Sequence, residues 1–118
     1  MASNSLQNIK TFKSSFNSLT VTPNIFTGNT SLEKFEANMP LLTNGYEMFA
    51  NCTSLTHFKG DLDNIVSAER MFYNTSLIKF EGNLESLVNC NDMFSGCTTI
   101  TDFISPKLTS LINGDGMF

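Results

Sequence analysis

Hydrophobic residues recur at a fixed period along the chain. Met-Phe occurs four times and Ile-Phe once, and the phenylalanines of these pairs are 23, 23, 22 and 24 residues apart. A period of this length is the signature of a stacked repeat architecture. Set on this period, the sequence forms one repeat domain over 1–118 with five units: 5–26, 27–49, 50–72, 73–94 and 95–118.

Four more apolar positions recur inside each unit, before the closing pair. They form these columns: Ile9, Leu32, Leu55, Leu77 and Ile100; Phe12, Phe35, Phe58, Phe80 and Phe103; Phe16, Met39, Leu62, Leu84 and Leu108; Leu19, Leu42, Ile65, Leu87 and Leu111. All 11 phenylalanines, and every methionine except Met1, belong to these columns or to the closing pairs. We therefore predict that the aromatic residues form a core rather than a binding pocket.

Two segments of each unit are candidate strands. A β-branched column favours extended backbone at Thr20, Thr43, Val66, Val88 and Ile112. The second candidate is the segment 54–62, in which Leu55 and Phe58 would point inward. Around the Met-Phe pair, residues 46–52 lack β-branched side chains and predict a short helical turn. The expected fold is mainly β with short helical turns, a solenoid of five coils joined by parallel strands ~4.8 Å apart.

Composition narrows the class of protein. Only 15% of the 118 residues are charged and the net charge is -4, so no basic patch predicts a nucleic-acid partner. No stretch approaches the ~20 apolar residues of a membrane span. The first ten residues show no signal-peptide pattern, so we expect an internal protein, a virion protein or a piece of a longer one.

Charged residues form columns of their own. Signs alternate from unit to unit at Lys13, Glu36, Lys59 and Glu81, and again at Glu47, Arg70 and Asp92. This alternation predicts ion pairs between neighbouring coils on solvated faces. The alternative is a recognition surface. Its candidate residues are Lys34, His57, Lys59 and Lys79, with Tyr46 and Tyr73, which lie outside the apolar columns and are either binding residues or partly buried corner residues.

Cysteine and histidine are too sparse for a reactive centre. The three cysteines are an odd number, and Cys52 and Cys97 share a column two coils apart, about 10 Å and beyond disulfide reach. We predict three free thiols, with Cys90 in a small-residue column beside Gly45, Ala68 and Gly114. The single histidine, His57, occupies a mixed surface column, so no zinc site, catalytic pair or cofactor is expected. We predict that the protein is not an enzyme.

Three triplets at 29, 51 and 74 match N-glycosylation acceptors. They are interpreted as one column of the repeat, so the periodicity itself accounts for them.

The unit C-T-S-L-x-x-F-x-x-x-L-x-x-I-x-x-x-x-x-M-F, at 52–72, resembles the BspA-type (Treponema-type) leucine-rich repeat, in the "MF..C.SL..F" variant of bacterial, mycoplasma and phage proteins. The resemblance covers residues 5–118. Three units lack the cysteine after the closing pair, and the usual asparagine ladder is absent. The resemblance implies a right-handed β-solenoid of leucine-rich-repeat type and a recognition or adhesion module for a protein or glycan, at a cell or virion surface. It supplies no catalytic residues.

The alternative function is a structural spacer or decoration element in a virion or surface assembly. Solenoids need caps over their terminal coils. Residues 1–4 would form a minimal cap, and no capping segment follows Phe118. We therefore expect either a piece of a longer array or an end coil that packs against a neighbouring copy.

Overall fold

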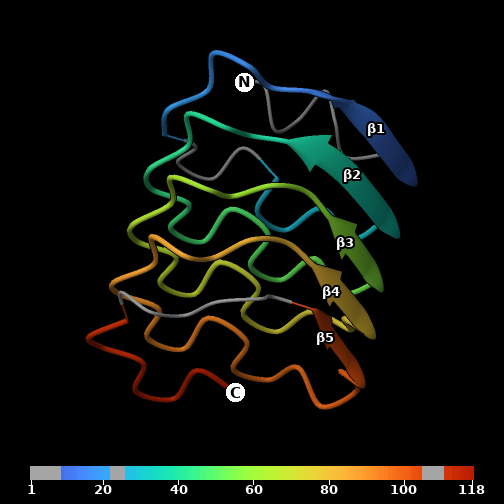
Figure 1. Cartoon of the computed structure of the whole chain (residues 1–118). Coiled ribbons are helices and arrows are strands. Elements are labelled where there is room, and N and C mark those ends of the chain that lie inside the picture. The colour runs from blue at the N-terminus through green and yellow to red at the C-terminus, as the bar shows by residue number, and fades with distance from the viewer. Residues whose placement is uncertain (1–8, 22–25, 105–110) are drawn as a thin grey trace.

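The computed structural model describes residues 9–21, 26–104 and 111–118. This chain is an all-β solenoid of about four turns, in which each turn lies on the one before it (Figure 1). The strands are β1 (Thr11–Ser15), β2 (Lys34–Asn38), β3 (His57–Lys59), β4 (Lys79–Glu81) and β5 (Asp102–Ile104).

The five strands form one parallel sheet in the order β1-β2-β3-β4-β5. The register aligns the members of one sequence column, as in the pairs Phe12↔Phe35 and Phe35↔Phe58. Because side chains alternate along a strand, the phenylalanine at the second position of each strand points inward and its two neighbours point outward. The second of the two candidate segments, 54–62, is therefore the one that contains a strand.

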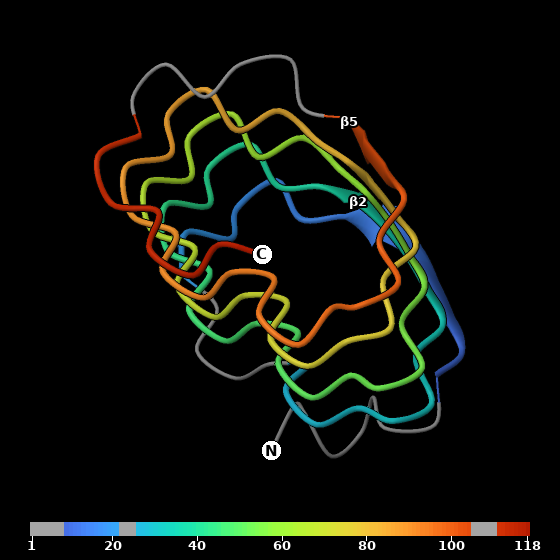
Figure 2. The same cartoon turned by 90° about the horizontal axis from the view of Figure 1, so that it is seen from below.

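The β-branched column forms no strand, and only isolated β-bridges lie beside it. The bridges are one residue further on, from Val21↔Asn44 to Asn89↔Asn113, and Val66 is 44% exposed. The column still bonds coil to coil, since the Val66 amide donates to the Thr43 carbonyl at 2.9 Å. Turns on both sides leave no room for three extended residues, so the prediction of a strand there is wrong. Figure 2 shows this side of the coil as a series of bends opposite the sheet.

The predicted helical turn at the Met-Phe corner is also wrong, because the described residues contain no helix. The corner consists of tight turns closed by bonds such as Met48 N–H to Gly45 O and Cys52 N–H to Phe49 O. Glu47 has φ 52° and Asn51 has φ 63°. An α-helix needs φ near −63° at every residue, so these left-handed positions prevent one.

The core consists of two interleaved stacks of phenylalanine rings. Rings of the strand column stack on one another, as do rings of the Met-Phe corner, with centroids 5.1–5.5 Å apart. Rings of one stack meet the other edge to face, as for Phe58 and Phe72 at 4.9 Å. Both geometries are favourable for aromatic rings, so the apolar columns form the predicted core.

The small-residue column is confirmed as a close-packed corner. Ala68 and Cys90 are fully buried, and a side chain on Gly45 would meet the Met71 sulfur at 2.9 Å. Leu108 of the apolar columns, the proposed cap at 1–4, and parts of the first and last units lie outside the described residues.

The three glycosylation-like triplets do not share one column. Asn51 and Asn74 are exposed, but Asn29 is only 2% exposed. Gly28 is the residue that matches Asn51, since both have positive φ. The amide of each also donates to a carbonyl in the next coil, and that carbonyl belongs to the residue just before the next member of this left-handed column. The interpretation is wrong at Asn29 because it is three residues after the closing phenylalanine of its preceding unit, whereas Asn51 and Asn74 are two residues after theirs.

Candidate functional site: the outward face of the sheet

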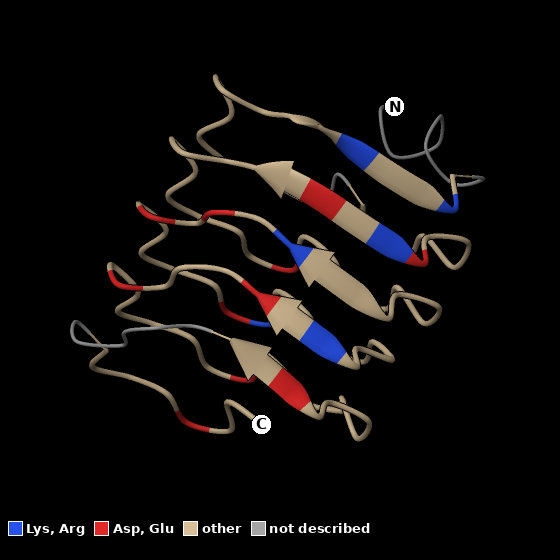
Figure 3. Ribbon diagram, turned by 45° about the vertical axis from the view of Figure 1, so that its right-hand side comes forward, with Lys and Arg blue, Asp and Glu red and all other residues tan. Residues whose placement is uncertain are grey.

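Two rows of side chains project from the outward face of the sheet. The register gives the first row as Thr11, Lys34, His57, Lys79 and Asp102, and the second as Lys13, Glu36, Lys59, Glu81 and Ile104. Figure 3 shows the charges spread along this face from β1 to β5. The inward phenylalanines of the same strands hold the rows in place, because ring stacking and backbone bonding use one register.

A hollow of about 280 Å³ lies between the two rows, over β1 to β4. Lys34, His57, Lys59 and Lys79 all line it, so the structure brings together four of the six candidate recognition residues. The strand backbone at Phe35 and Phe58 forms its floor, because the rings of both residues point inward and each residue is only 1% exposed. The hollow thus has sides on which lysines outnumber glutamates, and a floor of strand backbone.

The ion pairs on this face leave part of its positive charge uncompensated. Lys13 pairs with Glu36 at 3.8 Å between neighbouring strands, and Lys79 lies 3.9 Å from Glu81 on its own strand. Within the described ranges, neither Lys34 nor Lys59 forms an ion pair. The predicted ladder between coils is therefore present at β1–β2 and absent at Lys59.

The two tyrosines do not line the hollow. Tyr46 is 42% exposed beside the bridge residue Asn44, whose side chain accepts a bond from the Tyr46 amide at 3.0 Å. Tyr73 is half-buried, and the Arg70 guanidinium lies 4.0 Å from the centre of its ring. Tyr73 thus helps to hold a corner of the coil, while Tyr46 remains an exposed aromatic apart from the hollow.

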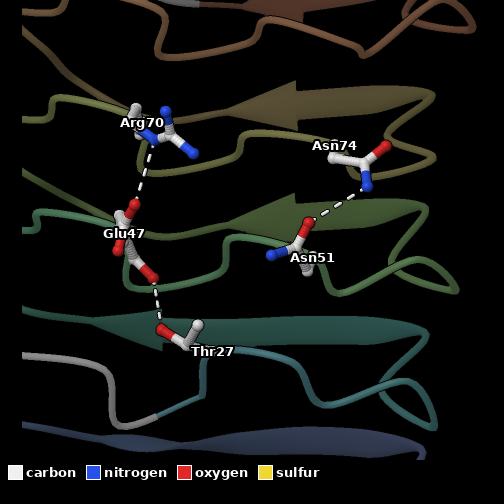
Figure 4. Close-up of polar contacts among 5 residues, drawn as sticks. All are labelled: Thr27, Glu47, Asn51, Arg70 and Asn74. Carbon is white, nitrogen blue, oxygen red and sulfur yellow. Dashed lines mark hydrogen bonds and ion pairs between the residues drawn. The ribbon is translucent and has the colours of Figure 1, made fainter.

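Polar contacts between coils hold the Met-Phe corner (Figure 4). Arg70 Nε lies 2.9 Å from Glu47 Oε2 as an ion pair without an aligned hydrogen bond. The Thr27 hydroxyl donates to the Glu47 carbonyl at 2.6 Å, and Asn74 Nδ2 donates to Asn51 Oδ1 at 3.0 Å. The predicted pairing is therefore present between Glu47 and Arg70, whereas within the described ranges Asp92 forms no ion pair.

The left-handed positions of the corner were not recognised in the sequence. Glu47, Arg70 and Asp92 all have positive φ, a conformation that disfavours most residues other than glycine. Gly116 is the next residue of this column, and a glycine there is the feature of the sequence that indicates a left-handed position. Gly28, Asn51, Asn74 and Gly96 form the second such column, and its composition of glycine and asparagine alone is typical of this conformation.

The thiols are not arranged for nucleophilic chemistry. Burial raises the pKa of Cys52 to about 11, so the reactive thiolate is scarce at neutral pH. Its thiol donates to the Phe26 carbonyl at 3.1 Å, and Cys97 repeats this bond to Phe72 at 3.0 Å. Burial also raises the pKa of Cys90. All three cysteines are free, as predicted, while His57 is exposed on β3 and lies near the Thr56 hydroxyl, 2.9 Å from its Nδ1.

We expect Cys52 to make stability fall at alkaline pH. Its folded pKa of about 11 lies above the ordinary value of 9.0, so the unfolded chain loses its proton first as pH rises. This contribution to the free energy of unfolding is complete below pH 9.0 and is lost as the pH rises to about 11, for about 3 kcal/mol at most. Urea unfolding of the wild type and of Cys52→Thr across this pH range measures the loss of stability. Threonine is the replacement because Thr75 occupies the same column in the next coil. Equal slopes in the two proteins would contradict the assignment.

Other classes of site find no support in the described part of the chain. No group of three or more histidine, cysteine, aspartate or glutamate side chains there could hold a metal ion. None of its segments is a helix long and apolar enough to cross a membrane. No family model, curated protein or solved structure matches the chain.

Proposed function

We propose that this protein is a non-enzymatic recognition scaffold, which binds a protein or glycan through the outward face of its sheet, at a cell or virion surface. The observation that carries the proposal is the hollow lined by Lys34, His57, Lys59 and Lys79. Its basic side chains are not all used in ion pairs within the described ranges, whereas the corner charges Glu47 and Arg70 are paired with each other. Side chains free of intramolecular partners are available to a ligand.

The same proposal includes the architecture of a right-handed, BspA-type leucine-rich repeat with five coils. Its support is the sequence period of the five units, together with five parallel strands whose phenylalanines share one register. A rigid stack of this kind presents the same outward positions at regular intervals, as extended binding surfaces of repeat proteins do.

Binding through the sheet face can be tested with arrays of glycans and extracellular proteins. A ligand found on the array should lose at least about ten-fold in affinity for the double variant Lys34→Glu, Lys59→Glu, because attraction becomes repulsion at two positions. Lys10→Glu is the control, since Lys10 is exposed but does not line the hollow. A ligand whose affinity is unchanged by the double variant would place recognition elsewhere and contradict the proposal.

One observation favours the second candidate function, a structural element that packs through its end coil. In the last coil Ile112 is 83% exposed and Phe118 is 66% exposed, while the equivalent Phe94 is fully buried under the next ring. A neighbouring coil would continue the ring stack. Sedimentation velocity should then show concentration-dependent association that Phe118→Asp abolishes, and a monomer at all concentrations in both proteins would reject this function.

A further inference from the structure

We propose that the hollow over β1 to β4 binds an extended, acidic peptide segment of a partner protein. The inference rests on the proposed function and specifies the class of its ligand. Three properties of the outward face carry it: the order of charges in its first row, the chemistry of its floor, and its charge relative to the rest of the chain.

The first row contains basic groups side by side. Lys34, His57 and Lys79 are direct neighbours on β2, β3 and β4, and no acidic residue stands among them. Like charges directly opposite one another destabilise a sheet, whereas alternating signs stabilise it. The second row does alternate, since Glu36 stands between Lys13 and Lys59. In the first row, by contrast, Lys34 and Lys79 stand on either side of His57 with no carboxylate between them, so a bound anion can lie between the two ammonium groups.

The floor of the hollow favours a peptide over a glycan. Strand β3 pairs in parallel with β2 and β4 on its two sides, so its backbone amides and carbonyls are engaged in the sheet. The floor at Phe12, Phe35 and Phe58 is the strand backbone, because the rings of these residues point inward. Hydroxyl-rich sugars need hydrogen-bond partners when they are desolvated, and such a floor supplies few. Apolar side chains of a peptide can instead lie between the lysine stems, while its carboxylates reach the ammonium groups.

The sign of the charge on this surface is opposite to that of the whole chain. Four lysines and two glutamates line the hollow, so it is locally positive, while the chain has a net charge of -4. An acidic ligand is therefore attracted to this face and repelled by the rest of the molecule, which orients it. Asp102 ends the first row on β5, so the acidic part of the ligand would lie over β2 to β4.

Fluorescence anisotropy with a defined probe tests the inference on the full chain. The probe is a dye-labelled peptide, acetyl-Glu-Leu-Glu-Leu-Glu-amide, and its control has glutamine in place of each glutamate. We expect the acidic probe to bind more tightly than the control, and the difference to shrink in high salt. Lys34→Gln and Lys79→Gln should each weaken binding about two- to five-fold, and His57→Lys should strengthen it by a similar factor. Lys10→Gln removes the same charge from a residue that does not line the hollow, and it should leave binding unchanged.

Any of the following outcomes would overturn the inference. Equal binding of both peptides, or equal weakening by Lys10→Gln, would leave only an unspecific charge effect. A ligand from the arrays that is a glycan, and that loses affinity when Lys34 is replaced, would overturn the peptide assignment while the proposed function stands. Self-association abolished by Lys34→Gln would make the occupant a second copy. If no array ligand depends on the sheet face, the proposed function fails with it.

Discussion

Replacing Phe58 with alanine should lower the free energy of unfolding by about 4 kcal/mol. The side chain is 1% exposed and lies in the middle of the stack formed by the strand phenylalanines. It stacks on Phe35 at 5.5 Å and Phe80 at 5.2 Å, and it meets Phe49 at 5.6 Å and Phe72 at 4.9 Å edge to face. Truncation removes all four ring contacts and leaves a cavity. The neighbouring rings cannot move in to fill it, because backbone hydrogen bonds hold the coils on both sides in place.

Chemical denaturation followed by circular dichroism measures the loss, with Phe103→Ala as the matched control. Phe103 occupies the same column on β5 but is only partly buried, so its loss should be about half as large. If Phe58→Ala is unfolded in buffer, Phe58→Leu provides the comparison, since leucine refills most of the space. A loss below about 2 kcal/mol for Phe58→Ala would show that the ring stacks are not the main source of stability.

Replacing Gly60 with alanine should cost about 3 kcal/mol by overpacking at the end of β3. A Cβ atom there would collide with the backbone carbonyl oxygen of Ala37 in the preceding coil. The Gly60 amide also donates to the Glu81 carbonyl at 3.0 Å, so the chain is held between two coils and cannot move aside. The column continues with Gly82, whose Cβ would meet the Gly60 carbonyl at 2.6 Å.

Gly114→Ala is the control for this effect. Neither glycine has a positive φ, so both substitutions restrict the unfolded chain to the same extent. A Cβ on Gly114 would meet a Leu111 methyl at 3.3 Å and the Cys90 sulfur at 3.5 Å, side-chain atoms that can adjust. Thermal unfolding should show Gly114→Ala within about 1 kcal/mol of wild type. Equal effects of the two substitutions would contradict a steric requirement at Gly60.

The inward columns could be predicted from the sequence because the period fixes which residues meet between coils. Phe12, Phe35 and Phe58 share a column in the sequence and are neighbours in the sheet. A single coil cannot bury its apolar residues alone, so residues one period apart must stack. The same argument predicted the outward position of His57, the buried small column of Ala68, and the free thiols.

The tertiary structure decided how each coil bends, and with it which side chains share a surface. The turns around Val66 leave only single bridges at the next residue, and the left-handed φ of Glu47 prevents the helix expected at the corner. Periodicity cannot specify these angles, because it relates equivalent residues in different coils and not the directions within one coil. For this reason the sequence by itself determined the stacking, whereas only the fold gathered Lys34, His57, Lys59 and Lys79 around one hollow and left Tyr46 and Tyr73 outside it.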